Sequence, residues 1–125
     1  MTFRAAVIAI NTVKKGDFIG YSRGYRAKKD MRVAIISTGY ADGLPRALSN
    51  KGMIFCNGQF LKIVGKVSMD SVAVDAGDAD VKIMDEVVVF GDEIKVTDVA
   101  NRADTLPYEI LTGVSERVKR VYKNP

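Results

Sequence analysis

The sequence predicts a mainly β domain, arranged as a Greek-key-like β barrel with one or two short helices near its C-terminus. Three observations support this fold class. The apolar segments are short and rich in β-branched residues, Gly, Asn and Asp separate them at short intervals, and helix signals appear only late in the chain. The 125 residues fit one compact domain, and an apolar content of 47% is enough for its core.

Six segments carry the apolar runs expected of strands. They span residues 5–13, 32–37, 52–56, 59–64, 66–74 and 86–90. Asn57-Gly58 separates the third run from the fourth, and this pair is typical of a two-residue hairpin turn. The run at 66–74 alternates polar and apolar residues, as a half-buried strand does. A last strand at 118–122 would close the barrel.

Helix is expected only between residues 97 and 111. Thr97 could cap a short turn that continues through Asn101. Pro107 could open a second helix, because proline suits the first helical position, where its missing N–H is not needed. Everything before residue 97 is therefore assigned to strands and turns.

The absence of histidine excludes several kinds of chemistry. A chain without imidazole has no Ser-His-Asp triad, no Cys-His pair and no histidine metal site, and we expect no metal. Acid–base work must then come from Tyr, Lys, Asp or Glu. The one cysteine, Cys56, rules out an internal disulfide and suits a reducing compartment such as the cytoplasm. Its apolar surroundings predict a small buried residue rather than a reactive thiol.

The charge pattern argues against nucleic acid and membrane partners. The net charge is +4, and the densest basic group lies near the end of the chain, at Arg117, Lys119, Arg120 and Lys123. Such a run is usually a solvated surface, and no aromatic stripe accompanies it. No apolar run approaches the roughly 20 residues of a membrane span, and no signal peptide is visible.

Four stretches are more specific than the rest of the chain. They read GYSRGY at 20–25, GYADGLPR at 39–46, VGKVSMD at 64–70 and, less distinctively, TLPYEIL at 105–111. In the second stretch two glycines flank a tyrosine and a carboxylate after a predicted strand, and such loops often carry function. Residue types alone favour a plain tight turn with a packed tyrosine by about two to one.

The order and spacing of these stretches resemble the C-terminal β domain of alanine racemases, pyridoxal-phosphate enzymes of fold type III. The resemblance covers residues from about 4 to 122. It implies an isomerase that interconverts L- and D-alanine by two-base proton transfer on a pyridoxal phosphate aldimine, supplying D-alanine for peptidoglycan. The enzyme it implies is a cytoplasmic homodimer. An N-terminal (β/α)8 barrel holds the cofactor, and the β domain of one subunit covers the barrel of the other.

The resemblance therefore implies that residues 1–125 are the β domain and that the barrel is absent, so we expect the isolated chain to be inactive. It also assigns roles to individual residues. Tyr21 corresponds to the second catalytic base, and Met69 to the residue whose backbone N–H holds the substrate carboxylate. Tyr40, Asp42 and Arg46 correspond to the substrate access route, Asp70 orders the loop after Met69, and Tyr108 hydrogen-bonds the cofactor phosphate.

Each assigned side chain also has a purely structural interpretation. Tyr21 could pack at a strand end, and Asp42 and Arg46 could make a local turn hydrogen bond and a surface ion pair. The sequence departs from the family pattern at Ser22, usually glycine, at Lys66, often arginine, and at Ser68, a cysteine in some members. Lysine lacks the planar fork of arginine, so hydrogen bonding in the access route would change.

Two other functions stay open at the level of sequence. The domain could belong to a serine/alanine racemase or to a broad-specificity amino-acid racemase, because selectivity depends on a pocket assembled with the barrel. Alternatively, it could be a non-catalytic β-barrel interaction module. The amino-acid substrate would be a small molecule in the first case, and a protein would be the partner in the second.

Overall fold

The computed structural model describes residues 2–19, 24–115 and 118 and shows a mainly β domain with two short helices after the strands, as predicted. The elements in chain order are β1 (Phe3–Val13), β2 (Phe18–Ile19), β3 (Tyr25–Arg26), β4 (Met31–Ile36), β5 (Met53–Cys56), β6 (Gln59–Lys62), β7 (Val72–Asp75), β8 (Glu86–Phe90), α1 (Val96–Arg102) and α2 (Pro107–Gly113).

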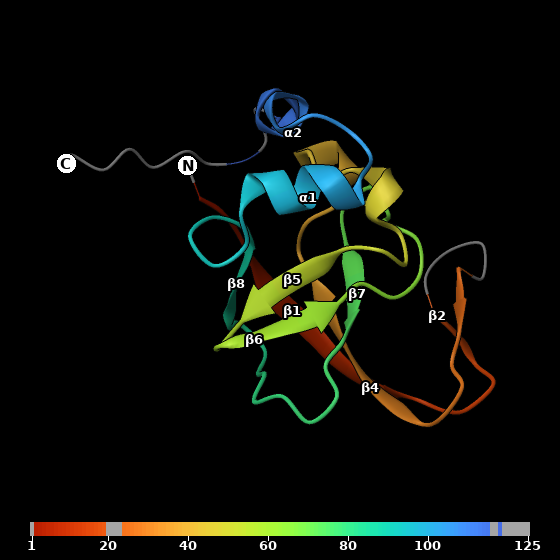
Figure 1. The fold of residues 1–125 in the computed structure, drawn as a ribbon. Coiled ribbons are helices and arrows are strands. Elements are labelled where there is room, and N and C mark those ends of the chain that lie inside the picture. Colours follow the sequence, from red (N-terminus) through yellow and green to blue (C-terminus); the bar gives the residue numbers. More distant parts are fainter. Residues whose placement is uncertain (1, 20–23, 116–117, 119–125) are drawn as a thin grey trace.

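The main sheet is antiparallel and has the strand order β6-β5-β8-β1-β4-β7. Strand β1 is 11 residues long and serves two neighbours, with its first residues paired to β8 and the residues from Val7 onward paired to β4. A register shift between Val7 and Ala9 marks a bulge, which bends a strand and increases its twist. The short strands β2 and β3 form a separate pair (Figure 1).

The described residues do not form the closed barrel that the sequence suggests. The two outer strands, β6 and β7, share no ladder. Ile63, the residue after β6, makes an isolated bridge with Val74 of β7. The strand expected at 66–74 is also wrong in its first part, because β7 begins only at Val72. Gly65 takes a positive φ of 84°, and the N–H of Ser68 donates to the carbonyl of Ser71 at 3.0 Å, so the chain turns back on itself here.

The core lies along the inner face of the curved sheet and beneath the helices. Residues with almost no exposed surface come from most of the strands, from the loops between them and from α1: Val7, Ile36, Ile54, Ile63, Val67, Val74, Val87 and Ala100. Cys56 joins them with an exposed fraction of 1%, which confirms the expectation of a buried thiol. Burial raises the pKa of this thiol, because the thiolate is poorly solvated there.

Both helices lie at one end of the sheet (Figure 1). Pro107 is the first residue of α2, as predicted, whereas α1 begins at Val96 and its cap position is Lys95 rather than Thr97. Of the strand expected at 118–122, only Val118 falls within the described residues. Among the described residues, no helix has both the length and the apolar character that a membrane crossing requires.

Candidate functional site

The turn at residues 39–43 follows β4 and forms a single turn of 3-10 helix at Tyr40–Asp42. The N–H of Gly39 donates to the carboxylate of Asp42 at 3.0 Å, and the N–H of Asp42 donates back to the carbonyl of Gly39 at 3.0 Å. Asp42 thus makes the local turn hydrogen bond that its structural interpretation requires. Gly43 ends the turn at φ 114°, a conformation that favours glycine.

This turn packs directly on the loop at residues 65–70. The N–H of Tyr40 donates to the carbonyl of Ser68 at 2.9 Å, and the N–H of Ala41 donates to the carbonyl of Met69 at 3.0 Å. A Cβ atom on Gly39 would lie 2.3 Å from the Ser68 carbonyl oxygen, so only glycine allows this approach. Two stretches that stood out in the sequence are therefore joined backbone to backbone.

Met69 is held through its carbonyl while the rest of the residue stays accessible. The residue is 52% exposed, and its N–H has no acceptor among the residues that the structure describes. The loop bends at Met69 and Asp70, and both residues are exposed. A backbone N–H that lacks an acceptor and sits on an anchored loop is a suitable donor for a carboxylate, because it needs little reorganisation.

Tyr40 and Arg46 form a pair beside this loop. The guanidinium carbon of Arg46 lies 5.1 Å from the centre of the Tyr40 ring, which is within range of a cation–π interaction. The Tyr40 side chain is 41% exposed, and Arg46 is exposed as well. The pair therefore presents an aromatic face and a positive charge to solvent, close to the loop that carries Met69.

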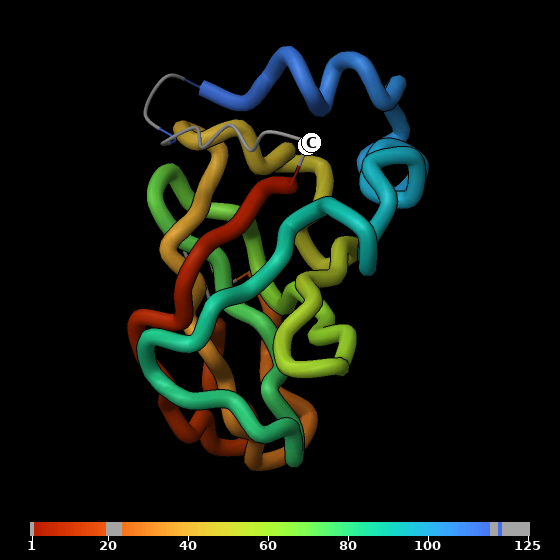
Figure 2. The backbone as a smooth tube through the Cα atoms, turned by 90° about the vertical axis from the view of Figure 1, so that its left-hand side faces the viewer, coloured from red at the N-terminus to blue at the C-terminus, as the bar shows by residue number. Residues whose placement is uncertain are grey.

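Helix α2 joins the same region through its C-terminal end. A Cβ atom on Gly43 would lie 2.6 Å from the carbonyl oxygen of Gly113, and the N–H of Ser115 donates to the carbonyl of Asp42 at 3.1 Å. Figure 2 shows α2 crossing above the segment that holds this turn. Tyr108 lies in the first turn of α2, and its side chain is 66% exposed.

Comparison with known proteins identifies the family. The model of the alanine racemase C-terminal domain matches residues 1–122. An alanine racemase of Vibrio parahaemolyticus is 39% identical over 123 residues, and one of Brucella abortus is 44% identical over 125 residues. The crystal structure of alanine racemase from Bartonella henselae with covalently bound pyridoxal phosphate is 40% identical and superposes with a TM-score of 0.94.

The chain belongs to the alanine racemase C-terminal domain family. These comparisons cover 98% of this chain but only 34%, 32% and 34% of the Vibrio, Brucella and Bartonella proteins. The chain thus spans about a third of the length of the racemases that it matches. The family suggested by the sequence motifs is confirmed, and the activity of the whole enzyme is a separate question.

The structure brings together most of the residues that the racemase resemblance singled out. Tyr40 and Arg46 are in contact. The Met69 carbonyl accepts a hydrogen bond from the N–H of Ala41, the residue after Tyr40. Tyr108 is connected to these residues only indirectly, because the end of its helix at Gly113 packs on Gly43 of the 39–43 turn. Tyr21, assigned as the base, lies outside the described residues.

Sequence reasoning missed Ser49 and Asn50, which hold the 65–70 loop from the other side. The Ser49 hydroxyl accepts the N–H of Val67 at 2.9 Å, and the side-chain oxygen of Asn50 accepts the N–H of Gly65 at 2.6 Å. Asn50 has a φ of 57°, in the left-handed region where asparagine is tolerated. An asparagine shortly before Gly52 is typical of a turn, but no local pattern predicts that its side chain contacts Gly65.

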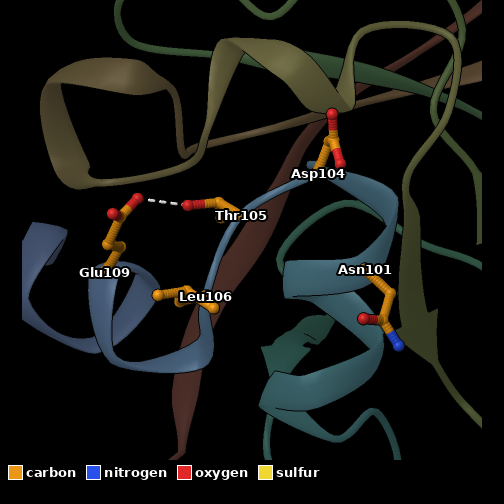
Figure 3. Close-up of a pocket in the computed structure, with 5 residues that line it drawn as sticks. All are labelled: Asn101, Asp104, Thr105, Leu106 and Glu109. Carbon is orange, nitrogen blue, oxygen red and sulfur yellow. Dashed lines mark hydrogen bonds between the residues drawn. The ribbon is translucent and has the colours of Figure 1, made fainter.

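A hollow between the two helices is lined by none of the residues to which the racemase resemblance assigns a role. Asn101, Asp104, Thr105, Leu106 and Glu109 line it, and its volume is about 470 Å³ (Figure 3). The Thr105 hydroxyl donates to the Glu109 carboxylate, so these two polar side chains already satisfy each other. The loop cluster around Met69 is the better candidate, because it combines the exposed Tyr40–Arg46 pair with a backbone N–H that has no acceptor in the described part of the chain.

Proposed function

We propose that this chain is the C-terminal domain of an alanine racemase that interconverts L- and D-alanine by two-base proton transfer and supplies D-alanine for peptidoglycan. The domain works together with a (β/α)8 barrel, of its own and of a partner subunit, which holds most of the cofactor. The Bartonella racemase carries covalently bound pyridoxal phosphate, which supports the choice of this cofactor. The isolated 125-residue chain is expected to be inactive.

One observation carries the proposal. Backbone hydrogen bonds join the 39–43 turn to the 65–70 loop, whose first residues are 26 positions apart in the sequence. They run from Tyr40 to Ser68 and from Ala41 to Met69. The geometry fixes the Met69 carbonyl, while the Met69 N–H has no acceptor in the described part of the chain. A β domain that served only as a structural module would have no need to combine a close glycine contact with a backbone donor that lacks an acceptor.

The residues present fit a role around pyridoxal phosphate. Tyr108 offers an exposed phenol at the start of α2, where it would hydrogen-bond the cofactor phosphate. When bound, pyridoxal phosphate acts as an electron sink and acidifies the Cα proton of the amino acid. The Met69 N–H would bind the substrate carboxylate, with Asp70 ordering the loop.

Tyr21 would take or return the Cα proton on the face opposite the barrel's own base. A free tyrosine has a pKa near 10, so a positive group must lie beside it for the phenolate to form. This chain has no histidine, so that group would come from an arginine or from the barrel. Tyr40 and Arg46 would line the route by which the amino acid reaches these residues.

Deuterium exchange at Cα tests the assignment in the enzyme assembled with its barrel. L-alanine and D-alanine are supplied separately in D2O to the wild type and to Tyr21→Phe. We expect the variant to lose racemisation and to keep exchange from one enantiomer only, because one of the two bases remains. Exchange from both enantiomers at near wild-type rates would show that Tyr21 is structural.

The same assay with serine and larger amino acids addresses the alternative substrates. A turnover of serine comparable to that of alanine would favour a serine/alanine or broad-specificity racemase. If the assembled enzyme turned over no amino acid, the interpretation as a non-catalytic interaction module would replace the racemase.

A further inference from the structure

Two N–H groups of the loop that carries Met69 are accepted by side chains, at alternate positions. The side-chain oxygen of Asn50 accepts the N–H of Gly65 at 2.6 Å, and the hydroxyl of Ser49 accepts the N–H of Val67 at 2.9 Å. Met69 is the next residue in this alternation, and its N–H has no acceptor among the described residues. Of the two acceptors, Ser49 holds the position closer to this N–H.

Ser49 itself is attached to a well-anchored segment. Its hydroxyl donates to the carbonyl of Arg46 at 2.6 Å, and its backbone N–H donates to the same carbonyl at 3.0 Å. Leu48, the preceding residue, is 2% exposed and packs in the core, so this short turn is held in place. Because the hydroxyl proton is committed to Arg46, the oxygen offers its lone pairs to the N–H of Val67.

Val67 connects this hydrogen bond to the direction of the loop. Its side chain has no exposed surface, so packing holds the residue while the hydroxyl of Ser49 holds its N–H. A buried N–H without an acceptor costs free energy. Without the hydroxyl, the backbone would relieve that cost by turning the peptide group that precedes Val67. Such a turn would change the direction of the backbone that leads to Met69.

We propose that Ser49 is a positioning residue for substrate binding, whose hydroxyl acts through Val67 to aim the N–H of Met69 at the substrate carboxylate. The inference rests on the proposed function, in which this N–H binds the carboxylate. The carboxylate does not react, so its contact is equally strong before and during proton transfer. Weakening such a contact raises KM and leaves kcat nearly unchanged.

Ser49→Ala removes the hydroxyl and is tested in the enzyme assembled with its barrel. Ser37→Ala is the matched control, because the hydroxyl of Ser37 also accepts a backbone N–H, that of Ala6 in β1 at 3.1 Å. The control therefore loses the same kind of hydrogen bond outside the loop that carries Met69. Both variants are compared with the wild type in KM and kcat for L- and D-alanine.

Two competitive inhibitors separate an aimed carboxylate donor from a general disturbance of the site. Propionate is alanine without its amino group, and ethylamine is alanine without its carboxylate. We expect Ser49→Ala to raise KM for both enantiomers and the inhibition constant of propionate by about 3- to 10-fold, the range that one neutral hydrogen bond supplies. The inhibition constant of ethylamine and kcat should stay close to the wild-type values, and Ser37→Ala should change none of these quantities.

Several results would overturn the positioning role of Ser49. An unchanged inhibition constant for propionate, or an equal weakening of propionate and ethylamine, would make Ser49 a purely structural residue. The same pattern in Ser37→Ala would have the same meaning. An inactive Ser49→Ala variant would also contradict the role, because the loss of one positioning hydrogen bond predicts a change in KM rather than in kcat.

The wild-type enzyme distinguishes a failure of this inference from a failure of the proposed function. If the wild-type assembly racemises no alanine, the proposed function is rejected, and the role of Ser49 is rejected with it. If the wild type racemises alanine and Ser49→Ala shows no selective loss of propionate binding, only the role of Ser49 is rejected.

Discussion

Gly39 is the residue on which the geometry of the site depends most directly. It has an extended backbone, with φ −148° and ψ −167°, so its conformation alone does not demand glycine. The demand comes from space, because Ser68 and Met69 occupy the volume that a side chain would need. The glycine therefore serves to bring two backbones together, and the placement of the Met69 N–H depends on that contact.

Gly39→Ala should destabilise the domain by about 1–3 kcal/mol, because an added methyl group must push a backbone segment away in a packed region. Chemical denaturation of the chain measures this change. The matched control is Gly113→Ala, since a Cβ atom there meets no atom within 4 Å and alanine favours helix. The control should be neutral or slightly stabilising. Equal losses in both variants would contradict the packing argument.

Thr38 precedes Gly39 and is 1% exposed, and its hydroxyl has no hydrogen-bond partner among the described residues. A buried and unsatisfied hydroxyl costs free energy. Thr38→Val keeps the shape of the side chain and should be neutral or raise the unfolding free energy by up to about 1 kcal/mol. Thermal and urea unfolding measure it. A clear loss of stability in Thr38→Val would indicate a buried water or another partner for the hydroxyl.

The predicted elements agree with the structure where the determinants are local. Asn57-Gly58 gives the β5–β6 hairpin, and Pro107 starts α2. The first part of the strand predicted at 66–74 was wrong, because alternation alone cannot reveal that the Ser68 and Met69 carbonyls accept hydrogen bonds from the 39–43 turn. The position of β8 between β5 and β1 could not be predicted from sequence patterns either, because it pairs residues that are far apart in the sequence. In the candidate site, the motifs singled out Tyr40 and Met69, whereas the contacts of Asn50 with the 65–70 loop became apparent only in the structure.

Between the strands, Asp30 links the end of β1 to the start of β4. Its carboxylate accepts the N–H of Lys15 at 2.8 Å and pairs with Lys14 at 3.6 Å. The backbone hydrogen bond from Lys15 and, to a lesser degree, the charge of Lys14 lower the pKa of Asp30, with desolvation acting in the opposite direction. The ionised form is therefore favoured by folding.

A lowered folded-state pKa makes a contribution that is present above the unfolded value of 3.8 and lost as the pH falls through the folded value. Asp30→Ala should therefore lower the unfolding midpoint relative to wild type at about pH 7, with the difference narrowing as the pH falls below 3.8. Urea titrations at the two pH values measure it. A difference that stayed constant or grew toward low pH would contradict the assigned hydrogen bond and charge.

At the scale of the whole molecule, the domain exposes large side chains where the site segments converge. Tyr40 and Met69 are exposed on adjacent loops, and Leu106 and Tyr108 are exposed at the start of α2. Exposed apolar groups of this kind often mark a surface that another domain covers. Under the proposed function, this surface is where the cofactor-binding barrel would dock.

Buried Cys56 reports whether the domain folds independently of that barrel. The thiol has a raised pKa and almost no exposure, so it should react with iodoacetamide only after unfolding. Mass spectrometry of the chain with and without denaturant measures the labelling. Rapid labelling of the native chain would show that the core around β5 is open in the absence of a second domain.

The central claim is that this domain is a necessary part of a racemase. The most direct test measures D-alanine formed from L-alanine, with pyridoxal phosphate present, by this chain alone, by a matching barrel domain alone and by the two together. We predict activity only when both are present. D-alanine formed by this chain alone, or a combined rate no greater than that of the barrel alone, would contradict the claim.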